Sequence, residues 1–205
     1  SPRKRVNLEL GNSTPLIVEA DADLDAAVAA TAQHSFSFAG QSCISIQRVY
    51  VQEAVYDEFV SALVPKVEAL KLGDPADEET DVGPVIDEGA RERILEWDDE
   101  ARSGGAEILT GGDVDGDLVR PTVIADAGPE LKVSCQEVFG PVVTVNRYRT
   151  LDEALELANG TEFELGPGEL YDIPPGHEGW TVGDEPCVML EWSGMRGWVD
   201  GSGKQ

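Results

Sequence analysis

Short apolar segments alternate with amphipathic segments along most of the chain. Residues 16–18 are an apolar run, followed at Asp21 or Asp23 by an acidic start that is typical of a helix N-terminus, where carboxylates face free N–H groups. The segment "ISIQRVYVQ" alternates like a strand, with apolar residues at Ile44, Ile46, Val49 and Val51. Residues 55–70 then repeat apolar side chains at three- and four-residue steps, which predicts a helix.

The same alternation continues to about residue 160. A charged helix is expected in "DEGARERILEWDDEARS", ended by Gly104 and Gly105 and followed by a strand at residues 107–109. The segments "RPTVIAD" and "GPVVTVNRY" are predicted strands, and "TLDEALELAN" is a predicted helix with Thr150 as its N-cap. Strands that alternate with helices at this pace predict a three-layer α/β domain with a largely parallel sheet.

The last part of the chain has a different character. Residues 161–205 hold three of the four Trp, both Met and nine of the 22 Gly, and they show no helical periodicity. Short apolar runs broken by Pro174, Pro175 and Gly176 predict a short antiparallel β segment. We therefore expect one domain at residues 1–160 and a separate β segment at residues 161–205.

Charge and cysteine content narrow the classes of partner and compartment. A net charge of −25 argues against nucleic acid and anionic membranes as partners, because both are polyanions. Such acidity fits a solvated surface or a salt-adapted host, and both interpretations stay open. No run of 18 apolar residues predicts a membrane span, and no signal peptide is visible. Three cysteines without a C-x-x-C pair fit a reducing cytoplasm.

Three residues of the first domain stand out as candidates for chemistry. Cys43 follows Gly40 and lies between a predicted helix and a predicted strand, where a thiol can be presented as a nucleophile. Glu9 precedes a Gly in "NLELGNSTP", and Glu137 lies beside a Gly-Pro turn in "QEVFGPVV". From the residues alone, a buried structural thiol and solvated or capping carboxylates are the favoured interpretations, and a catalytic role is the alternative.

Four segments together point to a family. The segments "NLELGNSTPLIV", "FAGQSCISIQRVYV", "TDVGPVID" and "QEVFGPVVTV" occur in the order and at the approximate spacing of the aldehyde dehydrogenase superfamily, which the chain resembles over about residues 3–160. Glu9 and Cys43 are 34 positions apart (43 − 9), as the base and the nucleophile of that family are. The resemblance implies a truncated aldehyde dehydrogenase catalytic domain.

The resemblance also implies a mechanism. Cys43 would attack the aldehyde carbon to form a thiohemiacetal, loss of hydride to NAD or NADP would leave a thioester, and Glu9 would activate the water that hydrolyses it. The backbone N–H of Cys43 would be one oxyanion donor. Glu137 would hold the nicotinamide ribose, Phe139 would pack near the ring, and the Leu10 carbonyl would face the nicotinamide amide.

The chain also departs from the family pattern. Asn12 stands where the family usually has a second Gly, and the cofactor-binding half of the family has no counterpart here. The family is usually homo-oligomeric, but its oligomerisation strand has no counterpart either. The chain begins without Met, as an internal fragment would. We expect aldehyde oxidation to be impaired in this chain alone, and the alternative is a catalytically inactive α/β fragment whose appendage acts as a binding or interaction module.

The tail has a resemblance of its own. Its segment "GTEFELGPGELYDIPPGHEGWTVGDEPCVMLEW" resembles the second half of a small cupin-type β-barrel, with Gly168, Pro174, Gly176 and His177 as the matching positions. Cupin metal sites need further histidines and a Glu that this chain lacks, so no metal site is expected. His34, the other histidine, is expected at the surface of a helix.

Overall fold

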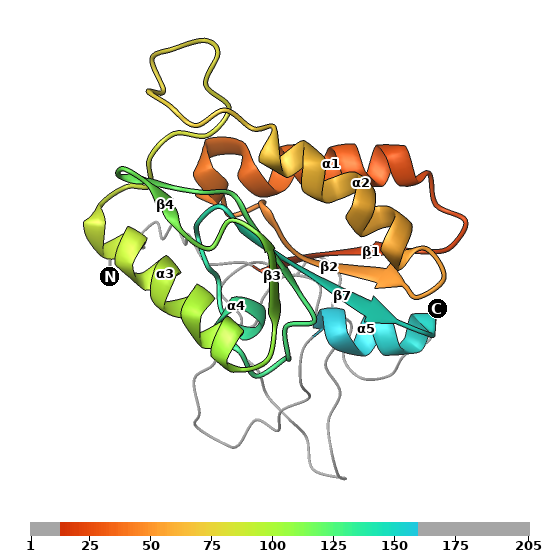
Figure 1. The fold of residues 1–205 in the computed structure, drawn as a ribbon. Coiled ribbons are helices and arrows are strands. Elements are labelled where there is room, and N and C mark those ends of the chain that lie inside the picture. Colours follow the sequence, from red (N-terminus) through yellow and green to blue (C-terminus); the bar gives the residue numbers. More distant parts are fainter. Residues whose placement is uncertain (1–12, 160–205) are drawn as a thin grey trace, which may run out of the picture.

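The computed structural model describes residues 13–159, where helices pack on a five-stranded sheet (Figure 1). The sheet has the order β1-β2-β7-β6-β3, in which β3 is antiparallel to β6 and the other neighbours are parallel. Its strands are β1 (Thr14–Val18), β2 (Ile46–Gln52), β3 (Glu107–Thr110), β6 (Thr122–Ala125) and β7 (Val142–Tyr148). This architecture confirms the predicted α/β domain with a largely parallel sheet.

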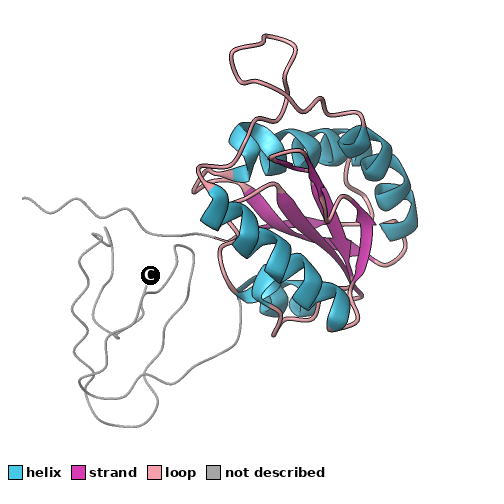
Figure 2. Ribbon diagram, turned by 60° about the vertical axis from the view of Figure 1, so that its left-hand side comes forward, coloured by secondary structure: helices cyan, strands magenta, loops and turns pink. Residues whose placement is uncertain are grey.

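Helices lie on both faces of the sheet (Figure 2). On one face α1 (Leu24–Phe36) packs against α2 (Tyr56–Glu68), and α3 (Glu88–Ser103) and α5 (Leu151–Asn159) lie on the other side. The single turn α4 (Lys132–Cys135) packs against α3 and β7. Two predicted caps are present, because Asp23 accepts a hydrogen bond from Ala26 N–H and Thr150 accepts one from Glu153 N–H.

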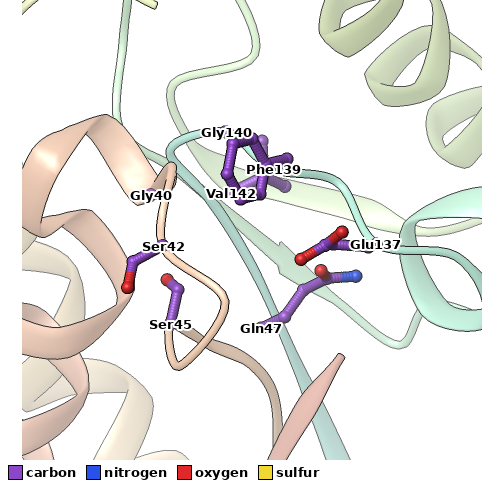
Figure 3. Close-up of a pocket in the computed structure, with 8 residues that line it drawn as sticks. All are labelled: Gly40, Ser42, Ser45, Gln47, Glu137, Phe139, Gly140 and Val142. Atoms are coloured by element: carbon purple, nitrogen blue, oxygen red, sulfur yellow. The ribbon is translucent and has the colours of Figure 1, made fainter. Parts of the chain in front are cut away.

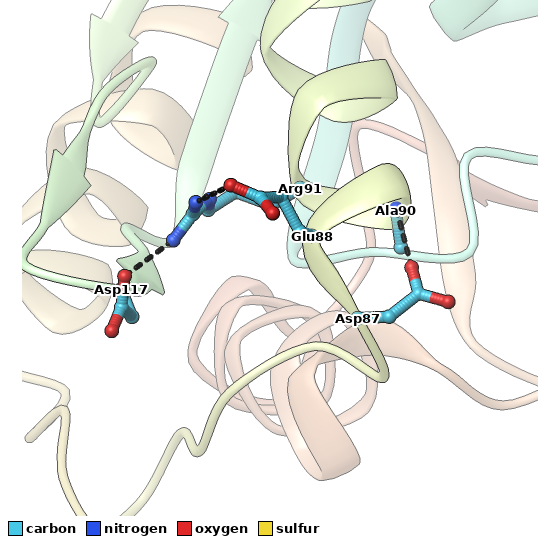
Figure 4. A network of polar contacts seen from close by, with 5 residues as sticks. All are labelled: Asp87, Glu88, Ala90, Arg91 and Asp117. Carbon is cyan, nitrogen blue, oxygen red and sulfur yellow. Dashed lines mark hydrogen bonds and ion pairs between the residues drawn. The ribbon is translucent and has the colours of Figure 1, made fainter.

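Helix α3 is tied to a hairpin that the sequence patterns did not predict. Strands β4 (Val114–Asp115) and β5 (Leu118–Val119) form a two-stranded sheet, and Gly116 in its turn has φ +60°. Arg91 of α3 forms an ion pair with Asp117 at 2.6 Å (Figure 4). The Gly116-Asp117 pair forms its two-residue loop, and Gly-Asp between two short strands is a hairpin signal that could have located it.

The predicted alternation in "ISIQRVYVQ" was wrong at both ends. Ile44 is 76 % exposed and lies in a turn before the strand, which begins at Ile46. Further along, Val49, Tyr50 and Val51 are buried in succession. Strand β2 lies between β1 and β7 with helices over both faces, so both of its faces are apolar and a simple alternation does not apply.

Several predictions fall on residues that the structure does not describe. The boundary between residues 1–160 and 161–205, the β segment that follows it and its cupin resemblance stay predictions. His177 belongs to the same undescribed part of the chain, whereas His34 lies exposed on α1, as expected. No helix among residues 13–159 is long and apolar enough to cross a membrane.

Candidate functional site

Cys43 lies at the tip of a tight turn between α1 and β2. The turn is closed by Ser45 N–H, which donates to the Ser42 carbonyl at 2.9 Å. The Ser45 hydroxyl donates to the carbonyls of His34 and Ser35 at the end of α1, so the turn is fixed to the helix before it. The Cys43 thiol is exposed and free. A thiol held on a rigid, open turn can reach a ligand from solvent, so its exposure contradicts the interpretation of a buried structural thiol.

The backbone before this turn is left-handed. Phe38 and Ala39 have φ values of 54° and 55°, and Gly40 has φ +68°. Non-glycine residues in this conformation cost about 1 kcal/mol or more each, and such residues are common at functional sites. A Cβ on Gly40 would lie 2.0 Å from the Gly140 carbonyl oxygen, so the chain before Cys43 lies directly against the Gly-Pro turn of residues 140–141.

Glu137 and Phe139 lie on the other side of this contact. Both line a small pocket with Gly40, Ser42, Ser45, Gln47, Gly140 and Val142 (Figure 3). Within residues 13–159, Glu137 Oε1 is buried without a hydrogen-bond partner. Phe139 has φ 48° and remains 38 % exposed. A half-buried carboxylate with a free oxygen is suited to accept hydroxyl groups of a ligand.

Sheet topology explains why these segments meet. Cys43 precedes β2 and Glu137 precedes β7, and these strands are parallel neighbours with Arg48 paired to Thr144. The amino ends of both strands therefore lie at one edge of the sheet. Open α/β sheets usually bind ligands at the opposite, carboxyl edge. The candidate site thus uses the amino edge of this sheet.

Of the five predicted site residues, the structure places Glu137 and Phe139 in one pocket, and Gly40, three residues before Cys43, packs against Gly140 beside them. The pocket is lined by Ser42 and Ser45 on either side of Cys43, and the thiol itself is outside the lining. Glu9 and Leu10 lie outside the described residues. Among residues 13–159, no hydrogen-bond acceptor is recorded for Cys43 N–H, which leaves it available to a ligand oxygen.

Gln47 is a residue of the site that the motifs did not single out. Its side chain is buried and makes three hydrogen bonds to the segment around Glu137. The signal in the sequence was a polar amide between Ile46 and the apolar run Val49-Tyr50-Val51. Buried amides nearly always have hydrogen-bond partners, so this position pointed to a structural contact elsewhere in the chain.

Comparison with known proteins decides the family. The model of the aldehyde dehydrogenase family matches residues 1–168, most of the chain. The chain belongs to the aldehyde dehydrogenase family. This confirms the resemblance of the four motif segments, and the largely parallel sheet is the fold of the aldehyde dehydrogenase catalytic domain.

Individual aldehyde dehydrogenases match at moderate identity. The chain is 44% identical over 165 residues to a 3-sulfolactaldehyde dehydrogenase of Priestia megaterium. The matched region covers 80% of this chain and 35% of the relative. A succinate-semialdehyde dehydrogenase [NADP(+)] of Mycobacterium tuberculosis is 44% identical over 162 residues, covering 78% and 35%. The crystal structure of a betaine aldehyde dehydrogenase from Staphylococcus aureus in complex with NAD+ matches with a TM-score of 0.71 and 38% identity, covering 74% and 31%. This family member therefore spans about a third of the length of these relatives.

Proposed function

We propose that the chain contributes the nucleophile and part of the cofactor contacts for oxidation of an aldehyde to a carboxylate with NAD or NADP. The observation that supports this most directly is the packing of Gly40, three residues before Cys43, against Gly140, one residue after Phe139. That contact holds the thiol turn beside a pocket-lining segment in which, within residues 13–159, the Glu137 Oε1 is buried without a hydrogen-bond partner.

The first step belongs to Cys43. As a thiolate, its Sγ attacks the aldehyde carbon and forms a thiohemiacetal, and the oxygen of this adduct takes the negative charge. The Cys43 N–H, which has no recorded acceptor within residues 13–159, is one donor for that oxygen. Loss of hydride from the same carbon then leaves a thioester on Cys43. A thiolate is both a good nucleophile and a good leaving group, which the later hydrolysis requires.

Glu9 and the cofactor contacts complete the proposal. Glu9 precedes β1, the neighbour of β2, by five positions (14 − 9), and would deprotonate the water that hydrolyses the thioester. The Glu137 oxygen that lacks a partner would accept a hydrogen bond from a ribose hydroxyl of the cofactor, while Phe139 would pack near its ring and the Leu10 carbonyl would accept from its amide. When bound, the nicotinamide accepts the hydride.

The substrate proposal stops at the class of aldehyde. The relatives are named for sulfolactaldehyde, succinate semialdehyde and betaine aldehyde, so aldehydes bearing a charged group are the first substrates to test. One of these relatives is named for NADP(+) and another binds NAD+, so both cofactors belong in the assay. A homo-oligomeric state and the predicted impairment of the isolated chain stay predictions.

The test combines turnover with thiol chemistry in the 205-residue chain. Succinate semialdehyde and betaine aldehyde are supplied with NAD+ or NADP+, and hydrolysis of p-nitrophenyl acetate is followed in parallel. Weak oxidation is expected because the chain spans a third of its relatives, and esterase activity through Cys43 is expected as well. Cys43→Ala should abolish either activity, because it removes the nucleophile.

Cys135→Ala is the matched control, because Cys135 is also free and exposed. It should leave both activities unchanged. Activity that survives Cys43→Ala would refute the nucleophile. Absence of any turnover, together with alkylation of Cys43 no faster than that of Cys135, would instead support the alternative of an inactive binding module.

A further inference from the structure

Gln47 connects two segments that are distant in sequence. Its Nε2 donates to the carbonyls of Val133 at 3.2 Å and Gln136 at 2.6 Å, and its Oε1 accepts from Val138 N–H at 2.9 Å. The side chain is only 5 % exposed. Every polar atom of the amide is therefore engaged with the 133–138 segment.

These hydrogen bonds lie on both sides of Glu137. The carbonyl of the preceding residue and the N–H of the following residue are both held by the one amide. The Val138 carbonyl is held from the opposite side by Arg93 Nη1 of α3 at 2.7 Å, and the Arg93 guanidinium stacks on the Trp97 ring. With the backbone fixed at both neighbours, the Glu137 side chain is directed toward the pocket, where Figure 3 shows it beside Gln47.

Gln47 also stands close to the nucleophile. It lies four positions after Cys43 in sequence, and the turn that presents the thiol leads directly into its strand. Gln47 lies between Ile46 and Arg48, which both pair with β1, and Arg48 also pairs with β7, so the sheet holds the backbone on either side of Gln47. The Gln47 amide thus fixes the irregular segment around Glu137 relative to strand β2.

We propose that Gln47 is a positioning residue that fixes the Glu137 segment relative to the Cys43 turn, and so sets the distance between the cofactor contact and the nucleophile. The functional meaning of this distance rests on the proposed function. Losing a buried amide–backbone hydrogen bond lowers the stability of a fold, above all when the partner stays buried and unpaired. A purely structural role would lower stability without changing the spacing in the folded protein.

The native cysteines allow the spacing to be measured without substrate or cofactor. Cys43 and Cys135 are both exposed, and Cys135 lies within the segment that Gln47 holds. In the full chain with Cys187→Ser, nitroxide labels on these two thiols report the distance between the segments by double electron–electron resonance. We expect a narrow distribution in this background and one roughly twice as wide with Gln47→Leu, because the segment gains local freedom.

Two further variants keep the test decisive. Gln47→Glu keeps the acceptor for Val138 N–H but replaces the donor by an oxygen that faces two carbonyls, so an intermediate or shifted distribution is expected even if Gln47→Leu does not fold. Gln52→Leu is the matched control: it removes a glutamine from the same strand whose side chain, within residues 13–159, accepts from nearby Ala54 N–H and has no recorded hydrogen bond of its own to the segment around Glu137. Its distribution should equal that of the background.

An unchanged distribution in both Gln47 variants, or equal broadening in Gln52→Leu, would overturn the proposal. Because the labels are read without aldehyde or nucleotide, this result is independent of turnover. If the spacing depends on Gln47 but the chain shows no turnover and Cys43 is alkylated no faster than Cys135, the positioning role stands and the proposed function fails.

Discussion

Steric contact with neighbouring backbone atoms, more than its own backbone conformation, prevents a larger residue at Gly40. Its φ of +68° can be reached by alanine at moderate cost, but a Cβ there would lie 2.0 Å from the Gly140 carbonyl oxygen and 2.4 Å from its carbon. Both obstacles are backbone atoms, which cannot rotate away. The glycine therefore allows two main-chain segments to touch at the site.

Gly40→Ala should lower the free energy of unfolding by about 3 kcal/mol or more, because the Cβ forces the two segments apart. Gly116→Ala is the matched control: its φ is +60°, and a Cβ there meets no atom within 4 Å. That variant should cost about 1 kcal/mol from backbone conformation alone. Urea denaturation of both variants measures the difference, and equal losses would contradict the steric explanation.

Among the helices, α3 contains a buried carboxyl group. Asp98 is fully buried on the side of the helix shared with Ile94, Trp97 and Ala101, and neither carboxylate oxygen has a hydrogen-bond partner among the described residues. Burial raises the pKa of Asp98 from 3.8 to about 7, although the nearby Arg102 guanidinium opposes the shift. The unfolded chain loses this proton near pH 4, whereas the folded protein keeps it until about pH 7.

Asp98 consequently destabilises the fold as pH rises from about 4 to about 7. A pKa of 3.8 in the unfolded chain and about 7 in the folded protein corresponds to a loss of roughly 4 kcal/mol in the free energy of unfolding. Asp98→Asn should be more stable than the original protein at pH 8 by a few kcal/mol, and the gap should fall to about 1 kcal/mol at about pH 4.5, close to the unfolded pKa of 3.8. Urea denaturation at the two pH values measures it.

The control for this prediction is Asp99→Asn, since Asp99 is an exposed neighbour on the same helix that pairs with Arg102. It should change stability by less than about 1 kcal/mol at either pH. A gain from Asp98→Asn that is equally large at pH 4.5 would contradict a titrating Asp98.

The elements themselves were largely predictable, and the exceptions have physical causes. Thr150 and Asp23 cap helices as expected because capping depends on neighbouring residues alone. The burial of Asp98 was an exception because carboxylates normally lie at the surface. Only its spacing from Ile94, Trp97 and Ala101 indicated that its side chain faces the core. Cys43, Glu137 and Phe139 were found through motifs, whereas Gln47 was missed because its partners lie 86 to 91 positions away.

For the whole molecule, charge is the dominant property. The net charge of −25 arises from 40 acidic and 15 basic residues. The ion pairs of the described residues mostly involve exposed side chains, and such pairs contribute little individually. Repulsion among the excess carboxylates therefore opposes folding, and salt screens it.

Raising NaCl from about 10 mM to about 500 mM should raise the melting temperature, because the screening length falls from about 30 Å to below 10 Å. Glu78→Lys, at an exposed position, should raise the melting temperature at low salt and have a smaller effect at high salt. A melting temperature that falls with added NaCl would show that the ion pairs outweigh the repulsion.

The location of the candidate site at the amino edge of the sheet has a practical consequence for protein engineering. The loops that leave the carboxyl ends of β1, β2 and β7 lie at the opposite edge, away from Cys43 and Glu137. Residues 20–21, between β1 and α1, are exposed there. A reporter peptide can therefore be inserted at this loop as a folding sensor while the thiol turn and its neighbouring pocket keep their native surroundings.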